Sequence, residues 1–130
     1  MIILRPTDIE DEVRKALADY MTVYVRPLPA KFTTPCILVT ATGGSSTNEI
    51  DSFNVTLDAR ATTDEESYSL IRTAQGILEA QGSNQFGAIR NVSINSLSRW
   101  GSDPVRPDLK LSTLTVVVTA HREEIAINES

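Results

Sequence analysis

Few side chains in this sequence are suited to nucleophilic or acid–base catalysis. The one histidine, His121, ends a strand-like segment, and the one cysteine, Cys36, lies inside the apolar run CILVT. Such catalysis requires a nucleophile, a base and an orienting group that come together, and no known motif surrounds either residue. We therefore expect no enzyme activity and a buried, inert thiol. A lone cysteine also forms no internal disulfide and excludes a metal site built on cysteine pairs.

Two groups of acidic residues have the ligand type that cations prefer. Three carboxylates stand together at positions 64–66, at a predicted helix start, where the helix dipole favours negative charge and most of the side chains point apart. Asp103 and Asp108 flank Arg106 in a proline-rich loop, and their oxygens could bind a divalent cation. Turn formation and pairing with Arg106 account for this second group more simply. We predict no metal site and no cofactor.

Composition and charge exclude several other classes of protein. The glycine-containing segment TGGSSTNE, residues 42–49, lacks the lysine of a phosphate-binding P-loop, and no GxGxxG pattern occurs. The net charge is −5 and the 12 basic residues are scattered, which argues against tight nucleic-acid binding. No apolar run approaches the roughly 18 residues of a membrane span, and the first residues do not resemble a signal peptide. We expect a soluble protein that stays in the compartment where it is made.

The remaining polar segments predict contacts with other molecules. Two loops, Gly43–Glu49 and Gly101–Asp108, are expected to project from the domain, and such loops often carry binding residues. Trp100 can anchor an interface or can simply cover the base of its own hairpin, and both interpretations stay open. From these segments we select as candidate interface residues Gly43, Gly44, Ser45, Ser46, Thr47, Asn48, Trp100 and Arg106.

Helical spacing of apolar residues predicts two amphipathic helices, each preceded by a capping box. In PTDIE, Thr7 is the expected cap and Glu10 its reciprocal partner, and the helix runs from about residue 8 to 20. In TDEE, Thr63 and Glu66 have the same roles, and the second helix covers residues 64 to about 81. Gly82 is then a natural stop.

Alternating and continuous apolar runs predict five strands. They are a short strand at 22–26, a central strand at 36–42, the clearly alternating segment 50–60, and a final pair at 89–97 and 109–121. In the final pair the apolar positions change face, at Leu97 and between Leu111 and Leu114. We therefore expect both strands of that hairpin to kink.

This order of elements predicts a single α+β domain over residues 1–130, with a flexible tail at about 122–130. Its core is a mainly antiparallel twisted sheet of about five strands with two helices packed on one face. The other face is then partly uncovered, and the last strand presents there a semi-polar row that suits a ring or non-obligate interface. The candidate interface residues of this row are Thr113, Thr115, Val117 and Thr119.

The layout as a whole resembles the tail terminator, or tail completion, proteins of long-tailed bacteriophages and prophages. The resemblance covers the chain from about Asp8 to Arg122 and rests on an arrangement of elements. It is carried by the opening acidic helix, by VYVRPLPAKFTTPCILVTATGG, by FNVTLDARATTDEESYSLI running into a helix, and by the closing RPDLKLSTLTVVVTAHR.

This resemblance implies a structural virion protein at the head-proximal end of the tail, assembled in the host cytoplasm. Members of the family form a homo-oligomeric ring, usually a hexamer, that caps the tail tube, stops its growth and joins the tail to the head. The implied partners are the tail tube protein and a neck or head-completion protein, with no membrane. DNA passes through the lumen without specific binding. Two alternatives stay open: a neighbouring neck or head-completion connector, and a small non-viral ligand-binding domain.

Overall fold

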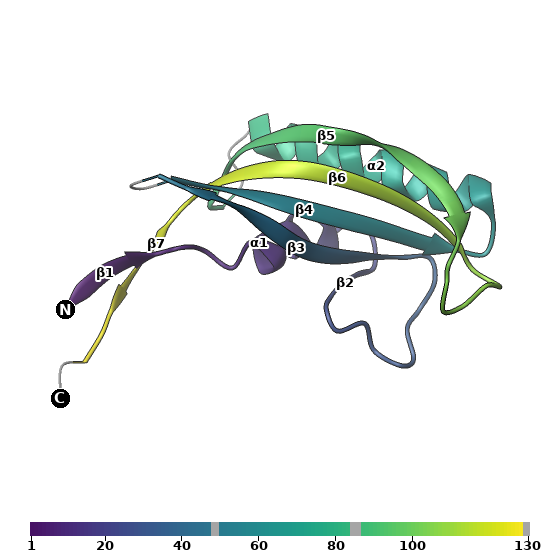
Figure 1. The fold of residues 1–130 in the computed structure, drawn as a ribbon, viewed down its shortest axis with the longest axis horizontal. Coiled ribbons are helices and arrows are strands. Elements are labelled where there is room, and N and C mark those ends of the chain that lie inside the picture. Colours follow the sequence, from purple (N-terminus) through teal and green to yellow (C-terminus); the bar gives the residue numbers. More distant parts are fainter. Residues whose placement is uncertain (48–49, 84–86, 129–130) are drawn as a thin grey trace.

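The computed structural model describes residues 1–47, 50–83 and 87–128 (Figure 1). Within these residues, seven strands and two helices follow one another as β1 (Ile2–Arg5), α1 (Ile9–Ala18), β2 (Val23–Val25), β3 (Cys36–Ser46), β4 (Ile50–Ala61), α2 (Asp64–Ser83), β5 (Ile89–Ser102), β6 (Lys110–His121) and β7 (Glu123–Ala126). Five strands form one sheet in the order β2-β3-β4-β6-β5, and β1 pairs with β7 in a separate ribbon.

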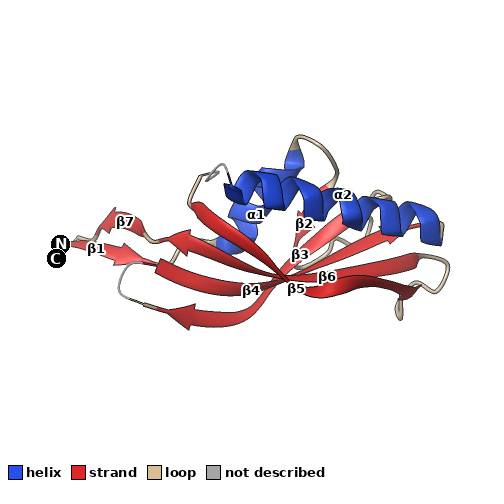
Figure 2. Cartoon of the chain, turned by 90° about the horizontal axis from the view of Figure 1, so that it is seen from above, coloured by secondary structure: helices blue, strands red, loops and turns tan. Residues whose placement is uncertain are grey.

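The predicted α+β class is confirmed, and the five-stranded sheet is mixed. Strands β2 and β3 are parallel, whereas the other three junctions are antiparallel. Both helices lie on the same face of this sheet, and within the described residues no helix covers the opposite face (Figure 2). The core between the helices and the sheet contains fully buried aliphatic side chains from both layers, among them Val13, Leu17, Val55, Leu57, Ile71, Leu78, Leu114, Val116 and Val118.

Thr63 is confirmed as the cap of α2, whereas the cap predicted for α1 is wrong. The Thr63 hydroxyl accepts the backbone N–H of Glu66 at 3.1 Å, as expected. In α1 the cap is Asp8, whose carboxylate accepts the N–H of Asp11 at 3.3 Å. The expected partner of Thr7, Glu10, instead accepts the N–H of Ala41 at 2.8 Å. Ala41 lies past the last residue of β3 that pairs with β2 and next to a register shift in β3. Its backbone N–H therefore has no acceptor on a neighbouring strand, and the Glu10 side chain of α1 provides one.

Gly82 does not end the second helix, which continues to Ser83. Gly82 is buried, and a Cβ added there would lie 2.9 Å from the Cγ2 atom of Val92. The missing side chain therefore allows α2 to approach β5 closely, which is a packing role in place of the predicted stop.

The expected loop Gly43–Glu49 is mostly strand. Residues 43–46 extend β3 and pair with residues 51–54 of β4, and the Thr47 N–H and hydroxyl both donate to the carbonyl oxygen of Ile50. The prediction was wrong because a Gly- and Ser-rich segment has no alternation of apolar residues from which a strand can be recognised. The backbone hydrogen bonds between β3 and β4 form without apolar side chains. Asn48 lies outside the described residues.

The predicted kink occurs in β5 and is absent from β6. Strand β5 has three register shifts against β6, whereas β6 pairs with β4 without interruption. Because β6 is continuous, Ser112 lies on the same face as Leu114 and is buried in the core. The Ser112 hydroxyl lies 2.8 Å from the Ser67 hydroxyl, which also donates to the carbonyl oxygen of Ala59. A satisfied polar pair thus occupies a core position that the apolar pattern alone does not predict.

The chain returns to pair with its own beginning, where we expected a flexible tail. Strand β7 is antiparallel to β1, and the N–H of Ile127 donates to the carbonyl oxygen of Met1 at 2.7 Å. We predicted a flexible tail because this segment has few apolar side chains. Backbone hydrogen bonds to β1 hold it as a strand instead. The resulting ribbon projects beyond the end of the five-stranded sheet (Figure 1).

Candidate functional site

The face of the sheet without helices, the open face, is lined by half-exposed and exposed polar side chains. Thr40, Thr56, Thr115 and Ser96 are register neighbours, so hydroxyl groups form a row across four strands. The next row places Val117 of β6 between Asn54 and Ser93. All four predicted interface residues of β6 lie on this open face and are half-exposed: Thr113, Thr115, Val117 and Thr119.

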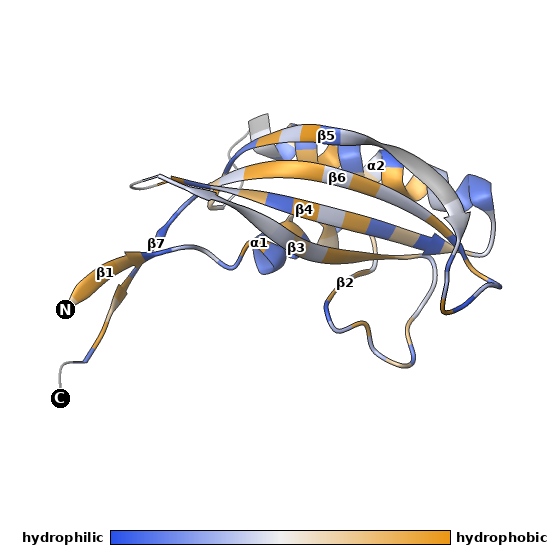
Figure 3. Cartoon of the chain, in the orientation of Figure 1, coloured by the Kyte–Doolittle hydropathy of each residue, from blue (hydrophilic) through white to orange (hydrophobic). Residues whose placement is uncertain are grey.

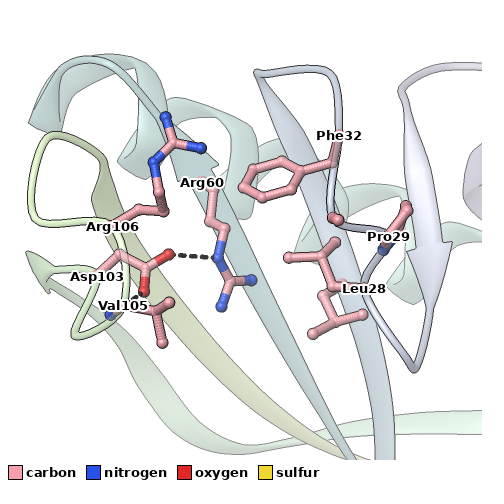
Figure 4. Close-up of a pocket in the computed structure, with 9 residues that line it drawn as sticks. Leu28, Pro29, Phe32, Arg60, Asp103, Val105 and Arg106 are labelled. Carbon is pink, nitrogen blue, oxygen red and sulfur yellow. Dashed lines mark hydrogen bonds and ion pairs between the residues drawn. The ribbon is translucent and has the colours of Figure 1, made fainter.

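At one end of the open face, two loops enclose a pocket of about 400 Å³ (Figure 4). One loop joins β2 to β3 and the other joins β5 to β6. Leu38 and Arg60 reach the pocket from neighbouring strands of the sheet. The loops contribute mainly apolar walls, and the full lining consists of Leu28, Pro29, Ala30, Phe32, Leu38, Arg60, Asp103, Val105 and Arg106.

An ion pair between Arg60 and Asp103 holds the second loop against β4. Arg60 Nε donates to Asp103 Oδ2 at 2.7 Å, and the two side chains are only 12% and 3% exposed. The Asp103 Oδ1 atom accepts the N–H of Val105 at 3.0 Å. Burial acts to raise the pKa of Asp103, but the Arg60 guanidinium and the backbone N–H groups outweigh it and hold the pKa below its usual value. Asp103 is therefore ionised in the folded protein at neutral pH.

The second arginine of the pocket is exposed and lies at its rim. The Arg106 guanidinium donates to both carboxylate oxygens of Asp108, at 3.1 and 3.0 Å, and stands 5.8 Å from the centre of the Phe32 ring. The predicted pairing of Arg106 with Asp108 is confirmed. The predicted pairing with Asp103 is wrong, because the Arg60 guanidinium donates to that carboxylate.

The β1–β7 ribbon is a second unusual surface, at the other end of β6. Met1, Ile2, Leu4 and Ile127 are large apolar side chains that are all exposed, Ile2 at 67%. Figure 3 shows the hydrophobic character of β1 and of the later part of β7. Exposed apolar side chains grouped in this way mark sites of association.

Arg122, between β6 and β7, anchors the root of the ribbon. Its Nε and Nη2 atoms lie 3.1 Å from the carboxylate of Asp51, which is 2% exposed. The hydrogen bond from Arg122 lowers the pKa of Asp51 below its usual value, even though burial opposes the shift. A charge pair therefore attaches the residue that precedes β7 to β4.

The other predicted residues are dispersed. Trp100 belongs to β5 by its backbone, but its side chain lies outside the described residues. Cys36 is fully buried, as expected, and burial raises the pKa of its thiol. His121 ends β6, where its N–H donates to the carbonyl oxygen of Ala88. The pocket, the Arg60–Asp103 pair and the ribbon were all missed. Only the outward phase of Arg60 in its alternating strand could have indicated a role for that residue.

Comparison with models of known protein families and with curated proteins finds no match to this chain. In the described part of the chain, no helix is long and apolar enough to cross a membrane.

Proposed function

We propose that this protein is a structural subunit of a long-tailed phage tail. In this role it forms a ring of about six copies that caps the head-proximal end of the tail tube and joins the tail to the head. The proposal is supported by the resemblance of the chain to tail terminator proteins and by exposed surfaces that suit contact with a neighbouring subunit.

The observation that carries the proposal is the β1–β7 ribbon. A two-stranded ribbon in water is only marginally stable alone, and this one exposes several large apolar side chains. A neighbouring subunit would cover these side chains and support both strands. In a closed ring of identical copies, every ribbon has such a neighbour.

The open face supports the same function in a second way. Its hydroxyl row and the half-exposed Val117 make it too polar for a core and too weakly charged for an ordinary solvated face. Surfaces of this composition suit subunits that remain soluble before they assemble. The net charge of −5 also suits a ring through which DNA passes without specific binding.

The pocket favours a second candidate function, a small ligand-binding domain. Its volume of about 400 Å³, its apolar walls and its few charged side chains fall within the range of small-molecule sites. That function is compatible with a monomer, whereas the ring is not.

The mass of the protein in solution separates the two functions. We expect a monomer at low concentration, and closed rings of about six copies at high concentration or on tubes of the tail tube protein from the same virus. Sedimentation equilibrium and electron microscopy of tube ends measure these states. A protein that stays monomeric at high concentration and never binds tube ends contradicts the ring proposal.

A further inference from the structure

The ribbon and the pocket lie at opposite ends of the same strand. The pocket loop precedes Lys110, at the start of β6, and the ribbon follows His121, at its end. The 12 residues of β6 span about 40 Å at roughly 3.3 Å per residue. Because the ribbon also projects away from the sheet (Figure 1), it cannot reach the pocket of its own chain.

One face of the ribbon combines an apolar side chain with a carboxylate. Leu4 and Glu124 are cross-strand partners, so their side chains lie next to each other on the same face. Leu4 is 46% exposed, and Glu124 is exposed as well. Within the described part of the chain the Glu124 carboxylate makes no ion pair, whereas the neighbouring Glu123 pairs with Arg5.

The pocket has the complementary properties. Its walls are mainly apolar, and Val105 at its edge is 85% exposed. Its lining contains two arginines: Arg60 is paired with the buried Asp103, and Arg106 is paired at the rim with Asp108, which lies outside the lining. Arg60 Nη1 is buried and has no hydrogen-bond partner among the described residues. Among the described residues, the ion pair of Arg106 is with Asp108. Such an exposed pair contributes little to stability, so Arg106 can exchange partners.

We propose that the β1–β7 ribbon of one copy docks in the pocket of the next copy, with Leu4 against the apolar walls and Glu124 beside Arg106. This inference rests on the proposed assembly of the chain and names the surfaces through which it occurs. Because the two surfaces differ, the contact is head-to-tail, and repetition of it produces a closed ring or an open filament.

Two variants, each with one damaged surface, test this contact. Leu4→Asp damages the ribbon, and Val105→Asp damages the pocket. Both residues are exposed, so we expect both variants to fold with unchanged circular dichroism. Each variant alone should need at least a tenfold higher concentration than the wild type to assemble. Tyr20→Asp is the matched control, because Tyr20 lies outside both surfaces and its exposed fraction, 62%, is between those of Leu4 and Val105. Its replacement should leave assembly unchanged.

The mixture of the two variants gives the decisive result. A Val105→Asp chain has an intact ribbon and a Leu4→Asp chain has an intact pocket, so the mixture should form one-to-one heterodimers that grow no further. If both variants assemble as well as the wild type, the ribbon–pocket contact is wrong, and the ring proposal is unaffected. If the variants behave as expected but the wild type forms only open filaments, the contact is supported and the ring is contradicted. A wild type that never assembles overturns both proposals.

The charge component has its own measurement. If Glu124 lies beside Arg106 of the next copy, Glu124→Gln should weaken assembly several-fold at low salt and reduce its dependence on salt concentration. Equal salt dependence of the variant and the wild type would remove Glu124 from the contact. Binding of a small molecule in the pocket that leaves assembly unchanged would instead assign the pocket to ligand binding and overturn the contact.

Discussion

The Nε atom of Arg60 lies 2.7 Å from the Oδ2 atom of Asp103, across 43 positions of sequence. This ion pair attaches the β5–β6 loop to the end of β4, the central strand of the sheet, and forms one wall of the pocket. Because both side chains are nearly buried, each charge depends on the other for compensation.

Asp103→Asn should lower the free energy of unfolding at pH 7 by about 3 kcal/mol, since it leaves the buried charge of Arg60 without a counter-ion. The folded pKa of Asp103 lies below its ordinary value of 3.8, so the ionised pair stabilises the fold above that pH. This contribution is lost as the pH falls through the folded pKa. Urea unfolding at pH 7 and at successively lower pH should show the difference between variant and wild type narrowing below pH 3.8.

Asp108→Asn is the control for this prediction, because Asp108 pairs with Arg106 at the exposed rim. It should change the stability very little at either pH. A difference between Asp103→Asn and the wild type that stays constant down to low pH would mean that the carboxyl group does not act through its charge.

Ser112→Ala should lower the free energy of unfolding by about 1 kcal/mol, the usual contribution of one hydrogen bond. The cost stays small because Ser67 keeps its bond to the carbonyl oxygen of Ala59. Ser93→Ala, on the exposed part of β5, should be nearly neutral. Thermal and chemical unfolding of the two variants check this, and equal values for both would show that the buried serine pair adds nothing.

Val116→Asp and Val117→Asp should have opposite outcomes, although the two residues are adjacent. Val116 is fully buried beneath the helices, so an unpaired carboxylate there costs several kcal/mol, comparable with the whole stability of a small domain. Val117 lies on the open face and should tolerate the charge in a folded monomer. Circular dichroism and size-exclusion chromatography separate the cases. An unfolded Val117→Asp protein would show that the open face is covered within the monomer.

Gly43→Ala should destabilise the protein by about 1–3 kcal/mol through backbone strain, because Gly43 has a φ of 144° beside the register shift in β3. Nothing lies within 4 Å of a Cβ added at this position, so side-chain clashes do not contribute. Gly101→Ala is the matched control, since Gly101 has equal space but no positive φ, and it should be close to neutral. Chemical unfolding compares the two, and equal stabilities would exclude backbone strain at Gly43.

The elements with strong apolar periodicity could be predicted from the sequence. Strand β4 and helix α2 appear within a few residues of their expected bounds, and the faces of Val116 and Val117 were assigned correctly. These predictions succeeded because local spacing determines which side of an element meets the core.

The missed features depend on partners that are far apart in the chain. Asp103 was expected to pair with its neighbour Arg106, and nothing local indicates that Arg60 is closer. Likewise, Ser112 is acceptable in the core only because Ser67 of α2 lies opposite. The pocket could not be predicted because its walls come from two loops that the fold brings together. The partners of buried polar side chains and the residues that line a pocket between loops depend on tertiary structure. The local spacing of residues in the sequence does not reveal them.

The pairing of β1 with β7 also affects the timing of folding. Met1 and Ile127 are hydrogen-bonded across 126 positions, so the ribbon closes only after nearly all of the described chain has been synthesised. Contacts of such long sequence separation form late, whereas the hairpins of the main sheet can form earlier. A nascent chain would thus hold a folded sheet and an unpaired β1. If the ribbon docks as proposed, a chain interrupted before Glu123 lacks the complete ribbon, and we expect it to be excluded from assembly.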